Sequence, residues 1–88
     1  MTLLKLREAS MEWREIGEEV VAVDLREARY LALNPTGAVL WPHLAAGATS
    51  DRLVDLLVER FACPRETAER DLGVFLEELR QMDLLEDQ

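Results

Sequence analysis

The chain has 88 residues, 49% of them hydrophobic, which is enough for one small domain with a core and argues against disorder. Ten Lys and Arg residues stand against 18 Asp and Glu, and the net charge of −8 disfavours binding to the phosphate backbone of nucleic acids. No apolar run approaches the roughly 18 residues of a membrane span, and the N-terminus lacks the apolar core of a signal peptide. A single cysteine cannot form an internal disulfide, which fits the reducing cytoplasm, so we expect a cytoplasmic protein. We also expect no contact with membranes.

The N-terminal half predicts three β-strands, at residues 11–16, 19–25 and 29–33, where apolar side chains alternate with polar or small ones. The intervening turns are short, and short loops join antiparallel neighbours, so we expect an antiparallel meander. Residues 1–10 hold only a brief leucine pattern, and we expect them to form at most a loose N-terminal arm.

Two helices are predicted next. Asn34 is a good N-cap and Pro35 suits the first helical position, so a helix of about three turns should run from there to Gly47. Pro42 removes one of its hydrogen bonds and should shorten or bend it. Thr49 or Ser50 should cap the second helix. Its predicted buried stripe is Leu53, Leu56, Leu57 and Phe61.

The third and longest helix should begin at Pro64 and reach Met82, with Leu84 and Leu85 packing against the core after it. Its predicted buried stripe is Ala68, Leu72, Phe75, Leu76 and Leu79. Val74 falls outside that stripe, in line with Asp71 and Glu78. It is either an isolated surface valine or part of a second, semi-apolar flank of the helix. On the pattern alone the isolated valine is the simpler interpretation.

The sequence lacks the usual signatures of a catalytic or metal site. His43 and Cys63 are the only residues of their kinds, so a zinc site of the common type cannot be assembled, and we expect no metal, cofactor or catalytic residue. A Cys–His nucleophile pair is formally available, but a solvated His43 and a small buried Cys63 are simpler. Strands followed by helices also suggest a winged-helix DNA-binding regulator. However, residues 64–82 carry three basic and five acidic side chains, which ranks DNA binding low.

One ordered set of residues in the chain is distinctive: Tyr30, Leu33-Asn34, Thr36-Gly37, Trp41, Gly47, Phe75-Leu76, Leu79 and Leu84-Leu85. This set resembles the PqqD-like family, the recognition elements that bind precursors of ribosomally made, modified peptides. The similarity covers nearly the whole chain, from about Trp13 to Leu85, and departs from the family at Pro42 inside the first helix.

The resemblance implies one α+β domain over residues 1–88, winged helix-turn-helix-like, with a three-stranded antiparallel meander followed by three helices. It also implies that the chain binds the leader segment of a precursor peptide as an added strand on the third strand of the sheet, against the third helix. The peptide-binding residues implied in this way are Arg29, Tyr30, Leu31, Ala32, Leu33, Asp71, Leu72, Val74, Phe75 and Glu78.

Among free-standing members, the chain looks most like those of lasso-peptide biosynthesis, which implies a leader peptidase, and with it a cyclase, as partners. A carrier of the peptide that becomes the cofactor PQQ, working with a radical SAM enzyme, is the alternative within the family. An exposed strand edge can also pair with a copy of itself, so we expect a monomer or a weak dimer.

Overall fold

The computed structural model describes residues 3–7 and 11–87, and the three predicted strands form one sheet in it. Strands β2 (Met11–Ile16), β3 (Glu19–Asp24) and β4 (Arg29–Ala32) are antiparallel neighbours in the order β2-β3-β4. The register pairs Trp13 with Ala22 and Ala22 with Leu31. The predicted meander is confirmed, although β3 and β4 each end one residue earlier than predicted.

The two faces of this sheet differ because successive side chains of a strand point to opposite sides. Val20, Ala22 and Asp24 of β3 are buried against the rest of the molecule. On the opposite face, Val21 of β3 and Tyr30 of β4 are exposed. The sheet therefore contributes one face to the core, and its other face is open to solvent.

Helix α1 (Pro35–Ala46) begins as predicted, with the Asn34 side chain accepting a hydrogen bond from the Gly37 backbone N–H. The helix continues through Pro42 to Ala46, so the proline does not shorten the predicted span of about three turns. At its C-terminal end Gly47 adopts a positive φ of 96°, a conformation that glycine tolerates best, and its N–H donates to the carbonyl of His43.

Helix α2 (Ser50–Phe61) is capped by the Thr49 side chain, which accepts a hydrogen bond from the Arg52 N–H. Its buried residues are Leu53, Val54 and Leu57. The prediction that Phe61 is buried is wrong, since its side chain is 38% exposed. Phe61 is the last residue of the helix, and the chain turns away directly after it, at the left-handed Ala62.

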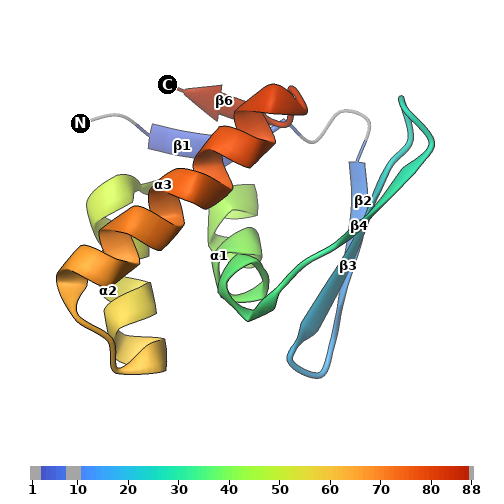
Figure 1. Ribbon diagram of the computed structural model, residues 1–88. Coiled ribbons are helices and arrows are strands. Elements are labelled where there is room, and N and C mark those ends of the chain that lie inside the picture. The colour runs from blue at the N-terminus through green and yellow to red at the C-terminus, as the bar shows by residue number, and fades with distance from the viewer. Residues whose placement is uncertain (1–2, 8–10, 88) are drawn as a thin grey trace.

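Helix α3 (Arg65–Gln81) starts after Pro64 and crosses in front of α1 and α2 (Figure 1). All five residues of its predicted stripe are buried, so the stripe is confirmed. They pack into one core with α1, α2 and the inner face of the sheet. None of the helices in the described part of the chain has the length and apolarity that a bilayer crossing requires.

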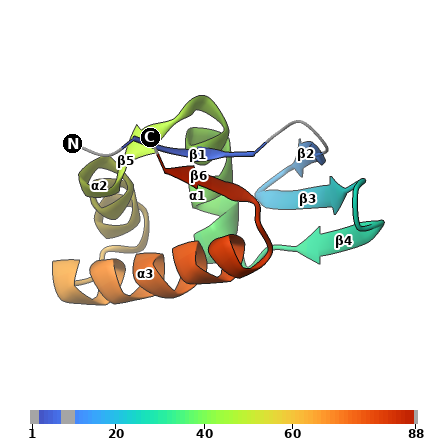
Figure 2. The same cartoon turned by 90° about the horizontal axis from the view of Figure 1, so that it is seen from above.

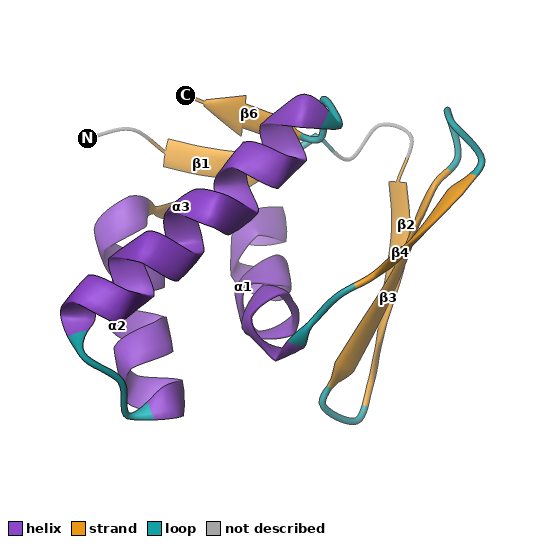
Figure 3. Cartoon of the chain, viewed as in Figure 1, coloured by secondary structure: helices purple, strands orange, loops and turns teal. Residues whose placement is uncertain are grey.

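A second sheet, which the sequence did not predict, lies above the helices (Figure 3). Strand β1 (Leu3–Leu6) pairs with β5 (Ala48–Thr49) on one side and with β6 (Leu85–Asp87) on the other. The expected loose arm is therefore wrong for these residues, because Leu4 and Leu6 are buried in the core. Residues 1–2 and 8–10 of that arm lie outside the described residues. The α+β class with three helices after the meander is confirmed, with this sheet as an addition.

Candidate functional site

In the described part of the chain the first sheet has two unpaired edges, one on β2 and one on β4, and the candidate edge is that of β4, which faces away from β3. Within the described part of the chain, β4 pairs only with β3 and is the last strand of its sheet. The view from above shows that β4 is also the strand on the α3 side of the molecule (Figure 2). An unpaired edge offers a row of backbone N–H and C=O groups to another extended segment.

The five predicted edge residues divide between the core and the solvent. Leu31 and Leu33 are half-buried and pack against the core, and Leu33 lies just beyond the end of β4. Tyr30 and Ala32 point to the open face, where Tyr30 is 79% exposed. The edge can therefore offer a bound segment its backbone groups, and Tyr30 is its most accessible large side chain.

The side chain of Arg29, predicted at the edge, is engaged inside the sheet. Its guanidinium donates to the buried carboxylate of Asp24 at 2.9 Å, and the Arg26 backbone N–H donates to the same carboxylate at 3.2 Å. Burial raises the pKa of the Asp24 carboxyl, but the Arg29 guanidinium and backbone N–H groups of the turn outweigh it, so the pKa lies below its ordinary value. This carboxylate holds the turn between β3 and β4 and so fixes where β4 begins.

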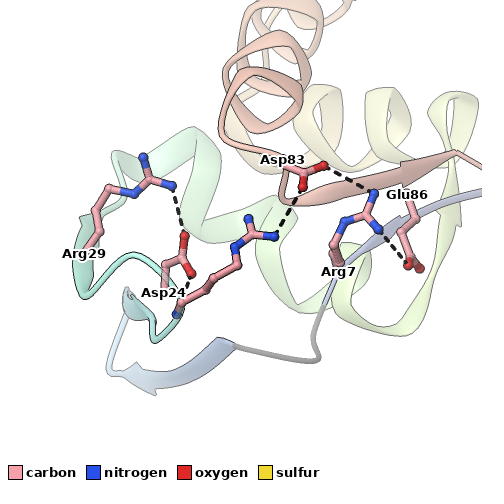
Figure 4. A network of polar contacts seen from close by, with 6 residues as sticks. Arg7, Asp24, Arg29, Asp83 and Glu86 are labelled. Atoms are coloured by element: carbon pink, nitrogen blue, oxygen red, sulfur yellow. Dashed lines mark hydrogen bonds and ion pairs between the residues drawn. The ribbon is translucent and has the colours of Figure 1, made fainter.

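The same turn is tied to the end of α3 by exposed ion pairs (Figure 4). Arg26 contacts the carboxylate of Asp83 at 3.3 Å, and Arg7 contacts it at 3.5 Å. Arg7 also reaches Glu86 of β6 at 3.7 Å. Exposed pairs of this kind contribute little stability, about 0–1 kcal/mol each. Their position matters more, because they link the β3–β4 turn to the C-terminal end of α3.

A cavity of about 230 Å³ lies between α3 and the start of α1, next to the C-terminal end of β4. Of the α3 residues predicted to bind peptide, Leu72 does not line it, since its side chain is 3% exposed and belongs to the core. Asn34 and Thr36 were not predicted, although their place directly after the strand edge could have indicated them. The lining residues are Asn34, Thr36, Asp71, Val74, Phe75 and Glu78.

The absence of a side chain at Gly37 allows α1 and α3 to meet at this cavity. A Cβ atom built on Gly37 would lie 2.9 Å from Cε1 of Phe75, closer than such contacts allow. Phe75 is 9% exposed and so forms the inner wall of the cavity. Val74, its neighbour in the chain, is 57% exposed, which shows an apolar side chain on the flank of α3 that the core does not need.

A larger cavity, of about 700 Å³, lies between the β2–β3 turn, the β4–α1 junction and the C-terminal end of α2. It contains three of the exposed large apolar residues, Ile16, Val21 and Phe61, and no residue of α3. Among the predicted residues only Ala32 and Leu33 line it. Of these two cavities, only the smaller one is lined by residues of α3, and β4 is the strand of its sheet on the α3 side of the molecule (Figure 2).

The two residues considered for nucleophilic chemistry have ordinary structural positions. The Cys63 thiol donates to the carbonyl of Leu57 at 3.7 Å, and His43 is an exposed residue of α1. Across the described residues no group of three or more His, Cys, Asp or Glu side chains is placed to hold a metal ion.

Two solved structures and one family model are similar to this chain. A structure of TbiB1, solved in complex with the TbiA(beta) leader peptide, is 32% identical, with a TM-score of 0.84, and the match covers 93% of this chain and 94% of that one. A lasso peptide synthetase B1, complexed with the leader peptide, shares the fold, with a TM-score of 0.79 over 94% of this chain and 96% of that one at 23% identity. No curated protein matches. The family model described as coenzyme PQQ synthesis protein D (PqqD) matches residues 19–85, and the chain therefore belongs to the PqqD family.

Proposed function

We propose that this chain binds the leader segment of a ribosomally synthesised precursor peptide and presents it to a leader peptidase in lasso-peptide biosynthesis. The leader adds as a strand to the β4 edge and lies against α3. The observation that carries the proposal is the open β4 edge on the α3 side, in a chain 32% identical to a protein solved with a leader peptide.

Strand addition matches what the edge can supply. Backbone groups of β4 would pair with those of the peptide and give affinity that depends little on sequence, while side chains at alternate peptide positions would give specificity. Every second peptide side chain would face α3, where the apolar surface of Val74 and Phe75 is available. Strand addition of this kind needs no reactive group, which supports a binding role for the chain.

The test uses the TbiA(beta) leader peptide, fluorescently labelled, with polarisation as the measure of binding. We expect saturable binding in the micromolar-to-nanomolar range. Two further peptides carry N-methyl groups at all odd or at all even positions of the bound stretch. In a strand only alternate N–H groups face the neighbour, so one methylated peptide should lose binding and the other should keep most of it. If both peptides bind as tightly as the parent, strand addition is refuted.

A charge-reversal variant tests the α3 side of the same site. Asp71 is exposed and lines the small cavity, so Asp71→Arg should weaken peptide binding while the circular dichroism spectrum stays unchanged. Glu59→Arg places the same change on an exposed position of α2 away from the cavity and serves as the control. Equal effects of the two substitutions would show that only the net charge matters.

Presentation is tested with the enzymes. Adding the chain should accelerate leader cleavage by a lasso-pathway peptidase, and the cyclase should then act on the freed core peptide. The family description favours a second candidate, a carrier in PQQ biosynthesis that delivers its peptide to a radical SAM enzyme. Formation of a ternary complex with that enzyme and its peptide, without any effect on the peptidase, would decide for the second candidate.

A further inference from the structure

The small cavity beside β4 has a single sign of charge. Among the residues that the structure describes, Asp71 and Glu78 are its only charged lining residues, and the others are polar or apolar. We propose that the leader side chain entering this cavity is basic, a lysine or an arginine. The inference rests on the proposed function, because it concerns the sequence preference of the same peptide site.

The spacing along α3 fits a long basic side chain. Asp71 and Glu78 are two helical turns apart on one face, so their Cα atoms are separated by about 10 Å along the axis. Val74 and Phe75 lie between them and provide an apolar wall. Lysine and arginine place their methylene stems along apolar surface and extend the charged group to its end. A stem lying on this wall would therefore reach a carboxylate in either direction.

Within the described residues, neighbouring cations make only weak contacts with these two carboxylates. Arg70 approaches Asp71 only at 4.0 Å, both side chains are exposed, and Arg70 does not line the cavity. In the part of the chain that the structure describes, the Glu78 carboxylate has no hydrogen bond or ion pair. Exposed pairs at such distances contribute about 0–1 kcal/mol, so a peptide cation can displace the Arg70 contact.

Within the described part of the chain, the start of α1 is the one positive feature at the cavity, and it is largely neutralised. A helix N-terminus carries about half a positive charge through its free N–H groups. Here the N–H groups of Gly37 and Ala38 already donate to Asn34, and Pro35 has none. Two full carboxylate charges outweigh the remainder, so the cavity favours a cation over an anion.

The experiment selects binders from a displayed library of random peptides on immobilised wild-type chain. We expect enriched peptides to carry lysine or arginine at one fixed position of the strand register. The Asp71→Asn/Glu78→Gln double variant removes both charges at nearly constant shape and should lose that preference. A control variant, Glu66→Gln/Glu69→Gln, removes two charges from the same helix outside the cavity and should keep it.

A double-mutant cycle then measures the contact itself. Replacing the selected lysine by norleucine should weaken binding to wild type about three- to fivefold, and should change binding to the neutralised variant by less than about twofold. The preference should also fade with salt, because exposed charges are screened over about 8 Å at physiological ionic strength. Both acidic side chains are exposed, and thermal melts confirm that the variants remain folded.

The outcomes separate this inference from the proposed function. Enriched peptides without a basic position, or a cycle without coupling, overturn the inference and leave peptide binding intact. If the wild-type chain enriches no peptide above the bare matrix, the proposed function fails and this inference fails with it.

Discussion

The substitution Val74→Ala separates a binding role from a structural one. Val74 is 57% exposed on α3, so its truncation removes almost nothing from the core, and the free energy of unfolding should stay the same or rise by up to about 0.5 kcal/mol, since alanine favours helix. A bound leader would cover the exposed part of the side chain. Two carbon groups at about 0.8 kcal/mol each, scaled by that exposed fraction, give about 0.9 kcal/mol, or about a fivefold loss of affinity.

Fluorescence polarisation with the TbiA(beta) leader peptide measures the affinity, and urea unfolding measures the stability. Ile16→Ala is the matched control, because Ile16 is also 57% exposed but lines the larger cavity instead. If Ile16→Ala weakens binding and Val74→Ala does not, the peptide occupies the larger cavity and the assignment to the β4–α3 side is wrong.

Three further predictions concern the framework of the site. The Asp24 carboxyl has a lowered pKa in the folded state. Its contribution to the free energy of unfolding is therefore fully present above the unfolded-state pKa of about 3.9 and is lost as pH falls through the lower folded-state pKa. The difference in free energy of unfolding between wild type and Asp24→Asn should be constant near neutral pH and narrow below about pH 4. Gly37→Ala should gain about 1 kcal/mol of helix propensity but lose about 1–3 through the collision with Phe75, a net loss of about 1 kcal/mol in urea unfolding. Leu6→Ala should cost about 2–5 kcal/mol in the same assay, since Leu6 is buried in β1.

Each of these has a clear contrary result. A stability gap for Asp24→Asn that does not change with pH would mean that the carboxylate is not held by its neighbours in the fold. A more stable Gly37→Ala variant would show that the Phe75 ring moves aside freely, and a cost below about 0.5 kcal/mol for Leu6→Ala would restore the loose arm.

The elements that the sequence predicted are those with a local signal. Alternating side chains mark β2, β3 and β4, and the Asn34-Pro35 pair marks the start of α1 through a cap that the structure contains. The buried stripe of α3 follows from helical periodicity alone. In each case the signal is a spacing or a cap within a few positions along the chain, so the sequence pattern alone carries the information.

The features that were missed depend on distant partners. Leu3–Leu6 becomes a strand because Ala48–Thr49 and Leu85–Asp87 lie on either side of it. Four leucine-rich residues do not indicate that these distant segments pair with them. Phe61 was assigned to the core by its spacing, but α2 ends at it and leaves it exposed. Spacing identifies a face of a helix and cannot say how far the neighbouring elements extend along it.

The sequence by itself determined the order of the three meander strands and the three helices, and it placed Val74 outside the buried stripe of an acidic helix, because periodicity and caps are local properties. Only the tertiary structure decided that Asn34 and Thr36 join Asp71, Val74, Phe75 and Glu78 around one cavity, since those segments are far apart in the chain. It also directed the Arg29 side chain to Asp24 and, among the described residues, left the backbone of β4 unpaired on its outer side. A cavity is the space between elements, and that space is set by how they pack.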